Sequence, residues 1–336
     1  IITDLQAVKQ IEKVRMMVHY GMGPSPYKVA RVTVSTSNEQ EAWTEAAVIE
    51  SLRRSGAAVL HPRLENALLI YDDVGRTALT RVYRDYVSIA RPAGVPILIC
   101  TPTWRANPER ISAAGITRDV NSDAVAFLKQ LKNEWMDQPS SLFIGGLVGC
   151  KNDCYKPREG LSTDAAEAFH LVQVHQLADA GVDFLLAATL PVVDEACGIA
   201  RAMQTTGLPY IISFVINRRG RILDGQSLEQ AFQKIDAVCN RPPLGYMINC
   251  AYPSFLRAHE QPRKVLARLI GFQANASSCD HAKLDGSELL QAAALDDWGD
   301  RMILLNRRHG IKILGGCCGT GPAHLKYLIH RYRESS

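Results

Sequence analysis

The sequence predicts an α/β protein built as a (β/α)8 barrel, and three observations support this. Short segments that are apolar throughout recur along the 336 residues, as in strands that are buried on both faces of a parallel sheet. Amphipathic stretches with helical spacing separate these segments. Eight such strand-and-helix units fit into the roughly 290 residues that follow residue 40, which is the size of a (β/α)8 barrel.

The expected strands are the apolar segments themselves. The first lies within 41–54, and the others are 94–104, 140–149, 180–191, 207–216, 243–250, 267–276 and 310–316. The clearest helices are 75–94, a segment that begins near Ser162, 193–207 and 227–238. Each helix ends near glycine and the next strand begins at once, as in right-handed βαβ units. A doubly wound open sheet is the alternative, disfavoured because no Gly-x-Gly-x-x-Gly fingerprint follows an early strand.

Residues 1–40 lie outside this repeat. Their middle is broken by glycine and proline, and only 30–36 has the composition of a strand. We therefore expect an N-terminal extension over 1–40, followed by one barrel domain over 41–336.

Composition excludes several classes of function. The net charge of +4 is spread along the whole chain, which argues against a nucleic-acid partner. No run of about 18 apolar residues occurs, so we expect no membrane span. The mixed and charged start lacks a signal-peptide pattern, and a cytoplasmic location is expected. In such a protein, nine cysteines are expected to be metal ligands, nucleophiles or buried residues, not disulfides.

Three of the cysteines lie where strands of the barrel end. Cys250 closes the sixth strand in YMINC, and Cys317 and Cys318 follow the eighth strand in KILGGCC. Active sites of these barrels lie at the carboxyl ends of the strands, so the three sulfurs can converge. Three thiolates with one open position are typical of catalytic zinc. On spacing alone, buried cysteines that act as small hydrophobic residues remain the alternative.

The phrases around these cysteines extend the pattern. They are GGCCGTGPAHL, an upstream NC at a strand end, and GFQANA between them. Over roughly residues 42–330 the chain resembles the homocysteine S-methyltransferase family. The resemblance implies a (β/α)8 barrel and a zinc ion held by Cys250, Cys317 and Cys318. It also implies that homocysteine binds the zinc as a thiolate and takes a methyl group from an activated donor to give methionine. Coordination lowers the pKa of such a thiol.

Two positions depart from the family pattern. The first strand of the family ends in an Asp-Gly-Gly type of phrase, whereas here Glu45 is followed by alanine. The fourth strand ends in a Glu-Thr pair whose Glu reaches the ammonium of homocysteine, whereas here Ala188 precedes Thr189. The expected substrate-binding residues are therefore Glu45, Thr189 and Asn249, although a strand-end cap is an equal alternative for Asn249. Either homocysteine still binds, with Glu45 taking its ammonium, or the acceptor is a thiol without an α-amino group.

The donor cannot be identified from the sequence. No further domain for cobalamin or folate is expected, which favours a small donor such as S-methylmethionine or a betaine. A separate corrinoid protein as a partner and a homo-oligomer both stay open. A zinc-binding barrel that has lost transfer activity is an alternative function. A zinc lyase or hydrolase is a weaker one, because three thiolates leave the ion a poor Lewis acid.

The loop after the third strand adds two further expectations. Cys150 and Cys154 in GCKNDCYKPREG are C-x3-C spaced, but His170 and His175, the next available ligands, are five residues apart and do not share a helix face. We therefore expect this loop to cover the methyl-donor site and not to hold a second metal. Trp104 can face a cationic donor through cation–π attraction, or it can simply pack at the rim, which is the favoured interpretation.

Overall fold

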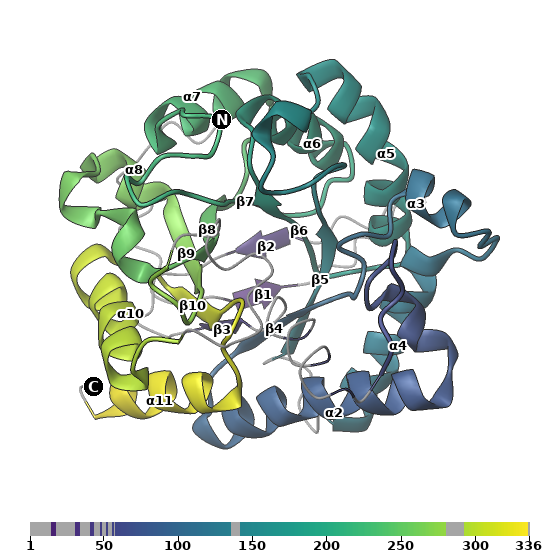
Figure 1. Cartoon of the computed structure of the whole chain (residues 1–336), viewed down its shortest axis with the longest axis horizontal. Helices are drawn as coiled ribbons and strands as arrows, with labels where there is room; N and C mark the ends of the chain where they lie inside the picture. The colour runs from purple at the N-terminus through teal and green to yellow at the C-terminus, as the bar shows by residue number, and fades with distance from the viewer. Residues whose placement is uncertain are drawn as a thin grey trace.

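Eight parallel strands close into a barrel in the computed structural model, which confirms the predicted fold (Figure 1). Each strand pairs with the next one along the chain, and the last pairs with the first. The strands are β3 (Glu41–Trp43), β4 (Ile97–Cys100), β5 (Leu142–Val148), β6 (Phe184–Leu190), β7 (Tyr210–Phe214), β8 (Gly245–Ala251), β9 (Leu269–Ala274) and β10 (Ile313–Gly316). Seven of the eight fall within the segments that the sequence predicts, and β8 extends one residue beyond its segment, to Ala251.

The structure describes the barrel and part of the N-terminal region. The described residues are 15–17, 31–33, 41–43, 48, 52, 56, 58–135, 142–279 and 292–334. The strands β1 (Arg15–Met17) and β2 (Arg31–Thr33) pair antiparallel, outside the barrel sheet. β2 lies within the predicted strand at 30–36. The division at residue 40 stays a prediction. Glu45 lies outside the described residues.

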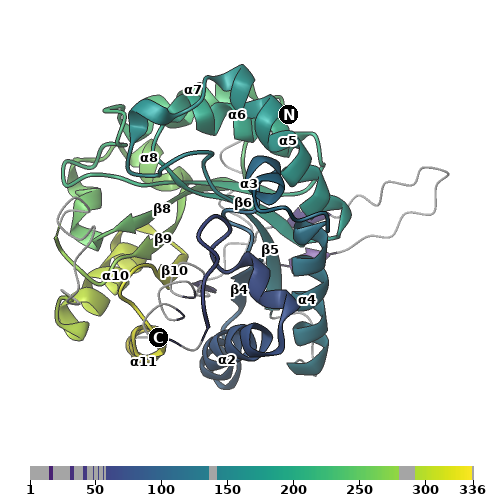
Figure 2. The same cartoon turned by 45° about the vertical axis from the view of Figure 1, so that its right-hand side comes forward.

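Helices surround the strands and bury their outer face. They are α2 (Asp73–Ala90), α3 (Pro108–Ala113), α4 (Val120–Trp135), α5 (Thr163–Asp179), α6 (Val193–Gln204), α7 (Leu228–Val238), α8 (Arg263–Arg268), α10 (Leu295–His309) and α11 (Pro322–Arg333). Short 3-10 turns are η2 (Ala67–Tyr71), η3 (Arg91–Ala93), η5 (Pro157–Glu159), η6 (Pro253–Leu256) and η7 (Ala258–Glu260). The turned view in Figure 2 shows the strands inside this ring, in which α11 lies beside α2. No helix among the described residues is long and apolar enough to cross a membrane.

The first predicted strand lies at the start of its apolar segment. Among the described residues of 41–54, Glu41–Trp43 pair as a strand, whereas Val48 and Leu52 are helical and buried. These two side chains are four residues apart, which is the spacing of one face of a helix. The apolar run therefore contains the end of a strand and the start of a helical segment, a combination that periodicity over so few residues does not resolve.

The barrel interior is filled with apolar side chains below its mouth. They form a separate cluster that contains Leu98, Cys100, Phe143, Leu147, Phe184, Leu186, Ala188, Ile211, Met247 and Ile313. Space for them comes partly from Gly145, where a Cβ atom would lie 2.4 Å from the ring of Phe184. The interior is thus a packed core and not a pore.

Candidate active site at the mouth of the barrel

The three predicted cysteines converge. The Sγ atoms of Cys250, Cys317 and Cys318 all lie within 4.8 Å of one another. Cys250 Sγ is 2.7 Å from Cys317 Sγ. Cys250 and Cys317 are buried, and Cys318 is half-buried. Among the described residues, this is the one group of three or more cysteine, histidine or acidic side chains close enough to hold a metal ion.

Unusual backbone geometry brings Cys250 to this position. It lies near the end of β8 with a φ of +52°, in the left-handed region that side-chain-bearing residues rarely adopt. The pairing of β8 with β9 shifts register between Asn249 and Ala251, so Cys250 is the bulged residue. Such bulges re-aim side chains beside functional sites. The strain is local to the point where the thiol must leave the regular strand.

The glycines of GGCCGTG have specific roles in the turn that carries the other two thiols. Gly316 leaves room for Thr320, whose Oγ1 atom would lie 2.0 Å from a Cβ there. Thr320 folds back and donates its hydroxyl hydrogen to the carbonyl oxygen of Cys317 at 2.7 Å. Gly319 takes a φ of +80°, which glycine adopts without strain. The turn is tied to the end of β9 because Cys317 N donates to Ala274 O at 2.7 Å.

Asn249 connects the thiols to the strand end that carries Thr189. Its Oδ1 accepts from Thr189 N at 2.9 Å and from Ser213 Oγ at 2.7 Å. Its Nδ2 donates to Thr189 Oγ1 at 2.6 Å and to Cys250 Sγ at 3.4 Å. These four bonds use the whole hydrogen-bonding capacity of the amide. Asn249 is therefore placed to orient its neighbours, and any direct contact with a substrate would compete with these bonds.

Apolar side chains enclose the thiols. Val215 forms one buried cluster with Cys250 and Cys317, and Tyr155 and Leu223 pack against it. Tyr155 comes from the loop after β5 and Leu223 from the segment after β7. Neither residue belongs to a motif that could be recognised from the sequence, because these loops come together only in the folded barrel.

Ala188 and Trp104 occupy the rim on the other side. Ala188 is 5% exposed and belongs to the interior cluster against which Trp104 packs. The indole Nε1 of Trp104 donates to the carbonyl oxygen of Ala188 at 3.3 Å. The Arg105 guanidinium lies 4.1 Å from the centre of the Trp104 ring. Trp104 thus packs at the rim, and one face of its ring already has a cationic partner.

The cysteines and histidines near the loop after β5 have other partners. His170 Nε2 lies 3.2 Å from Glu195 Oε1, and His175 Nε2 lies 3.0 Å from Thr205 Oγ1. Neither histidine joins Cys150 and Cys154 in a metal-binding group within the described part of the chain. Burial raises the pKa of the Cys150 thiol to about 12, so this thiol is protonated at neutral pH.

The donor set at the three cysteines fits a zinc ion. Burial raises the pKa of the Cys317 thiol, and its hydrogen bonds with Cys250 and Cys318 add to this effect. For Cys250, the bond with Cys317 lowers the pKa, but the bond with Cys318 and burial outweigh it and the net shift is upward. A divalent cation would offset the repulsion among three thiolates. Sulfurs bound tetrahedrally to zinc at about 2.3 Å lie roughly 4 Å apart. The group as a whole lies within 4.8 Å, and the Cys250 and Cys317 sulfurs, now 2.7 Å apart, would separate on binding.

Comparison with known proteins decides the family. The family model described as homocysteine S-methyltransferase matches residues 35–331. The chain belongs to the homocysteine S-methyltransferase family. It is accordingly a methyltransferase whose acceptor is a thiol of the homocysteine type. Both the family and the reaction class were predicted from the sequence.

Solved structures of one member have the same fold. The metallated form of the homocysteine methyltransferase MmuM from Escherichia coli superposes with a TM-score of 0.67 at 19% identity, over 88% of this chain and 97% of that chain. Its oxidised form gives 0.68 at 20% identity with the same coverage, and its apo form gives 0.61 at 18%. At these identities the likeness shows the shared barrel. The site residues therefore rest on the geometry of this chain.

Proposed function

We propose that this methyltransferase holds zinc at Cys250, Cys317 and Cys318 and transfers a methyl group from a small activated donor to homocysteine, giving methionine. The convergence of the three sulfurs carries this proposal, since three thiols from two strand ends, two of them buried and one half-buried, are one ligand short of the four that zinc takes and leave that position to an acceptor sulfur. When bound, the zinc lowers the pKa of the acceptor thiol so that it is a thiolate at neutral pH.

The protein's own side chains then align and shield the reaction. Asn249 fixes Cys250 through its bond to Sγ. Tyr155, Leu223 and Val215 keep water from the thiols, which makes the acceptor sulfur a better nucleophile than it would be in water. The sulfur forms a bond to the methyl carbon while the bond from that carbon to the donor breaks. The electron pair of that bond leaves with the donor, so that a cationic donor departs neutral.

Metal content and activity test the proposal together. We expect purified protein to carry one zinc per chain, and Cys318→Ala to lose both the zinc and methionine formation from homocysteine with S-methylmethionine or a betaine. Cys279→Ala is the matched control, because Cys279 is also half-buried but lies outside the three-thiol group. Protein that is free of zinc and indifferent to Cys318→Ala would refute the proposal.

A second candidate acceptor is a thiol without an α-amino group. Ala188 supports it, because the side chain at this position cannot pair with an ammonium and lies in an apolar cluster. The alcohol and amide groups nearby, at Thr189, Ser213 and Asn249, are neutral and bonded to one another. Rates with homocysteine and with a panel of simple mercaptans separate the two candidates. Turnover of mercaptans alone would replace homocysteine as the acceptor.

A further inference from the structure

A closed loop connects β5 to α5 and passes over the barrel mouth. It comprises residues 150–161 and follows Gly149, the residue after the end of β5. Asn152 Nδ2 donates to Glu159 O at 2.7 Å and so joins the two arms of the loop. Within it, Tyr155 N donates to Asp153 Oδ1 at 2.9 Å, which makes a local turn at the tip.

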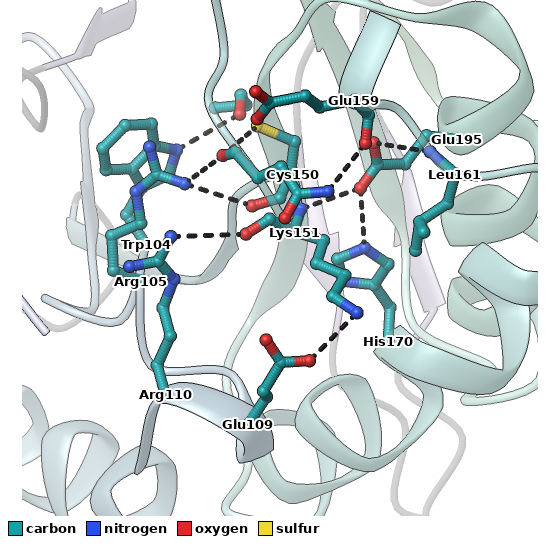
Figure 3. Close-up of polar contacts among 12 residues, drawn as sticks. Trp104, Arg105, Glu109, Arg110, Cys150, Lys151, Glu159, Leu161, His170 and Glu195 are labelled. Carbon is teal, nitrogen blue, oxygen red and sulfur yellow. Dashed lines mark hydrogen bonds and ion pairs between the residues drawn. The ribbon is translucent and has the colours of Figure 1, made fainter. Parts of the chain in front are cut away.

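One buried carboxylate holds both ends of this loop. Glu195, from the first turn of α6, is 1% exposed. Its Oε1 accepts from Lys151 N at 2.8 Å, and its Oε2 accepts from Leu161 N at 3.4 Å (Figure 3). His170 Nε2, on α5, is a third neighbour of the same carboxylate at 3.2 Å. Bonds from backbone N–H groups to a buried carboxylate are stronger than bonds between neutral groups.

Two arginines hold the same loop from the opposite side. Arg105 Nη1 donates to the carbonyl oxygens of Cys150 and Asn152. Arg110 Nη2 donates to Lys151 O at 3.5 Å. In Figure 3 the segment 150–152 lies between these guanidinium groups and Glu195. The carbonyl oxygens of this segment therefore accept hydrogen bonds from Arg105, in the loop after β4, and from Arg110, on α3. The N–H of Lys151 donates to Glu195 on α6.

The tip of this fixed loop meets the thiols. Tyr155 packs against the cluster of Val215, Cys250 and Cys317, which is also the place where an acceptor sulfur would enter. We propose that Tyr155 is a wall of the acceptor pocket and that Glu195 is the positioning residue that sets this wall, by clamping both ends of the 150–161 loop. The inference rests on the proposed thiol-acceptor site and adds the residues that determine how an acceptor fits it.

The rate of proteolysis within the 150–161 loop tests whether Glu195 holds it in place, and this measurement depends on neither activity nor bound metal. Arg158 is exposed in the loop and precedes a glutamate, whereas the bond after Lys156 is protected by proline. We expect trypsin to cleave after Arg158 in native Glu195→Ala about 10-fold to 100-fold faster than in the wild type, as expected for the loss of hydrogen bonds to a charged group. Glu195→Gln keeps one acceptor oxygen, so its cleavage rate should lie between those of Glu195→Ala and the wild type.

Asp183→Asn is the matched control. Asp183 Oδ2 also accepts from a backbone N–H, that of Ile144, at 2.7 Å. It lies just before β6, at the opposite end of the barrel from the thiols. This variant should leave cleavage after Arg158 at the wild-type rate. Equal cleavage in Glu195→Ala and the wild type would overturn the clamp.

Kinetics test the wall. We expect Glu195→Ala to raise the KM of the acceptor thiol about tenfold with zinc content unchanged, since lost ground-state contacts appear in KM. Tyr155→Ala should raise the same KM without altering cleavage. If Glu195 acts through Tyr155, the double variant should match the more affected single variant, because coupled residues are not additive. Additive effects of the two substitutions on KM would overturn the assignment. So would an unchanged KM in Glu195→Ala when its loop is cleaved rapidly.

These readouts separate this inference from the proposed function. If zinc were absent or homocysteine were not turned over, the proposed function would fail, while the cleavage rates would still report on the clamp. The KM comparison uses whichever thiol of the panel the wild type methylates. If Glu195→Ala does not fold, Glu195→Gln and Tyr155→Ala carry the same comparison. Wild-type cleavage in Glu195→Gln, or a wild-type KM in Tyr155→Ala, would overturn the proposal.

Discussion

Replacement of Asn249 by leucine should remove the hydrogen bonds that link Cys250 to Thr189 at the end of β6. Leucine has a similar size but neither donates nor accepts hydrogen bonds. Thr189 N would lose the side-chain acceptor that it has at 2.9 Å, and it cannot turn toward another because Thr189 is held at a φ of +62°. The Ser213 and Thr189 hydroxyls also lose a partner, but they can rotate.

The loss of stability can be estimated from the N–H and hydroxyl groups that lose a partner. A buried N–H without a partner costs about 1–3 kcal/mol, and each hydroxyl adds roughly 0.5–1 kcal/mol. We therefore expect Asn249→Leu to lower the free energy of unfolding by about 2–5 kcal/mol. The bond from Nδ2 to Cys250 Sγ is also lost, and groups that orient metal ligands typically change metal affinity by about 10-fold to 100-fold.

Urea denaturation and zinc competition with a chelator measure the two effects. Ser213→Ala is the control, because it removes one of the four bonds of Asn249 and leaves the bonds to Thr189 and Cys250 in place. It should cost about 1 kcal/mol and leave zinc affinity unchanged. If Asn249→Leu matched Ser213→Ala in both measurements, the reasoning that Asn249 positions Cys250 would be refuted.

Three further predictions concern helix packing, acceptor choice and pH. Gly198→Ala should lower the free energy of unfolding by about 1–3 kcal/mol despite the better helix propensity of alanine, because the new Cβ would lie 2.2 Å from Thr163 O; urea denaturation measures this. Ala188→Glu should raise the preference for homocysteine over a thiol without an amino group by roughly 10-fold to 100-fold, the worth of a hydrogen bond between charged groups; paired kcat/KM values test it. Burial lowers the pKa of His324 below 6.5, so the unfolded chain takes up a proton first as the pH falls. Stability from this residue is therefore complete above about pH 6.5 and is lost below it, and unfolding of His324→Gln should depend less on pH between 7.5 and 5.5.

Each of these predictions has a control. Gly299→Ala should cost less than Gly198→Ala, because its Cβ would meet the ring of Tyr327, which can rotate, instead of backbone. Equal costs would contradict the packing argument. An unchanged acceptor preference in Ala188→Glu would mean that the acceptor's amino group lies elsewhere. Parallel pH profiles of the wild type and His324→Gln would show that His324 titrates equally in the folded and unfolded chains.

The sequence predicted the barrel because a local property repeats eight times. Buried parallel strands are apolar throughout, and helices such as α2 and α7 carry one apolar stripe each, so both can be read from short windows. Within the predicted segment 41–54, Glu41–Trp43 form the first strand of the barrel, whereas Val48 and Leu52 belong to a helical segment. An apolar run of that length does not specify its own secondary structure.

The candidate site was predicted only in part, for a physical reason. Cys250, Cys317 and Cys318 were found because barrel strands all end at the same face, which makes residues distant in sequence neighbours in space. Tyr155 and Glu195 were not assigned to the site. Their roles depend on how a loop folds back over the mouth and which helix it meets, and these contacts have no period or motif.

The amino-acid sequence by itself determined the barrel, the family and the three sulfurs, since these follow from hydrophobic pattern and from residues at strand ends. Only the tertiary structure decided which side chains enclose those sulfurs and what holds them there. Asn249 could have been a cap or a ligand contact, and in the structure it makes four bonds to Thr189, Ser213 and Cys250. Such bonds join three strands, and their geometry exists only once the barrel has closed.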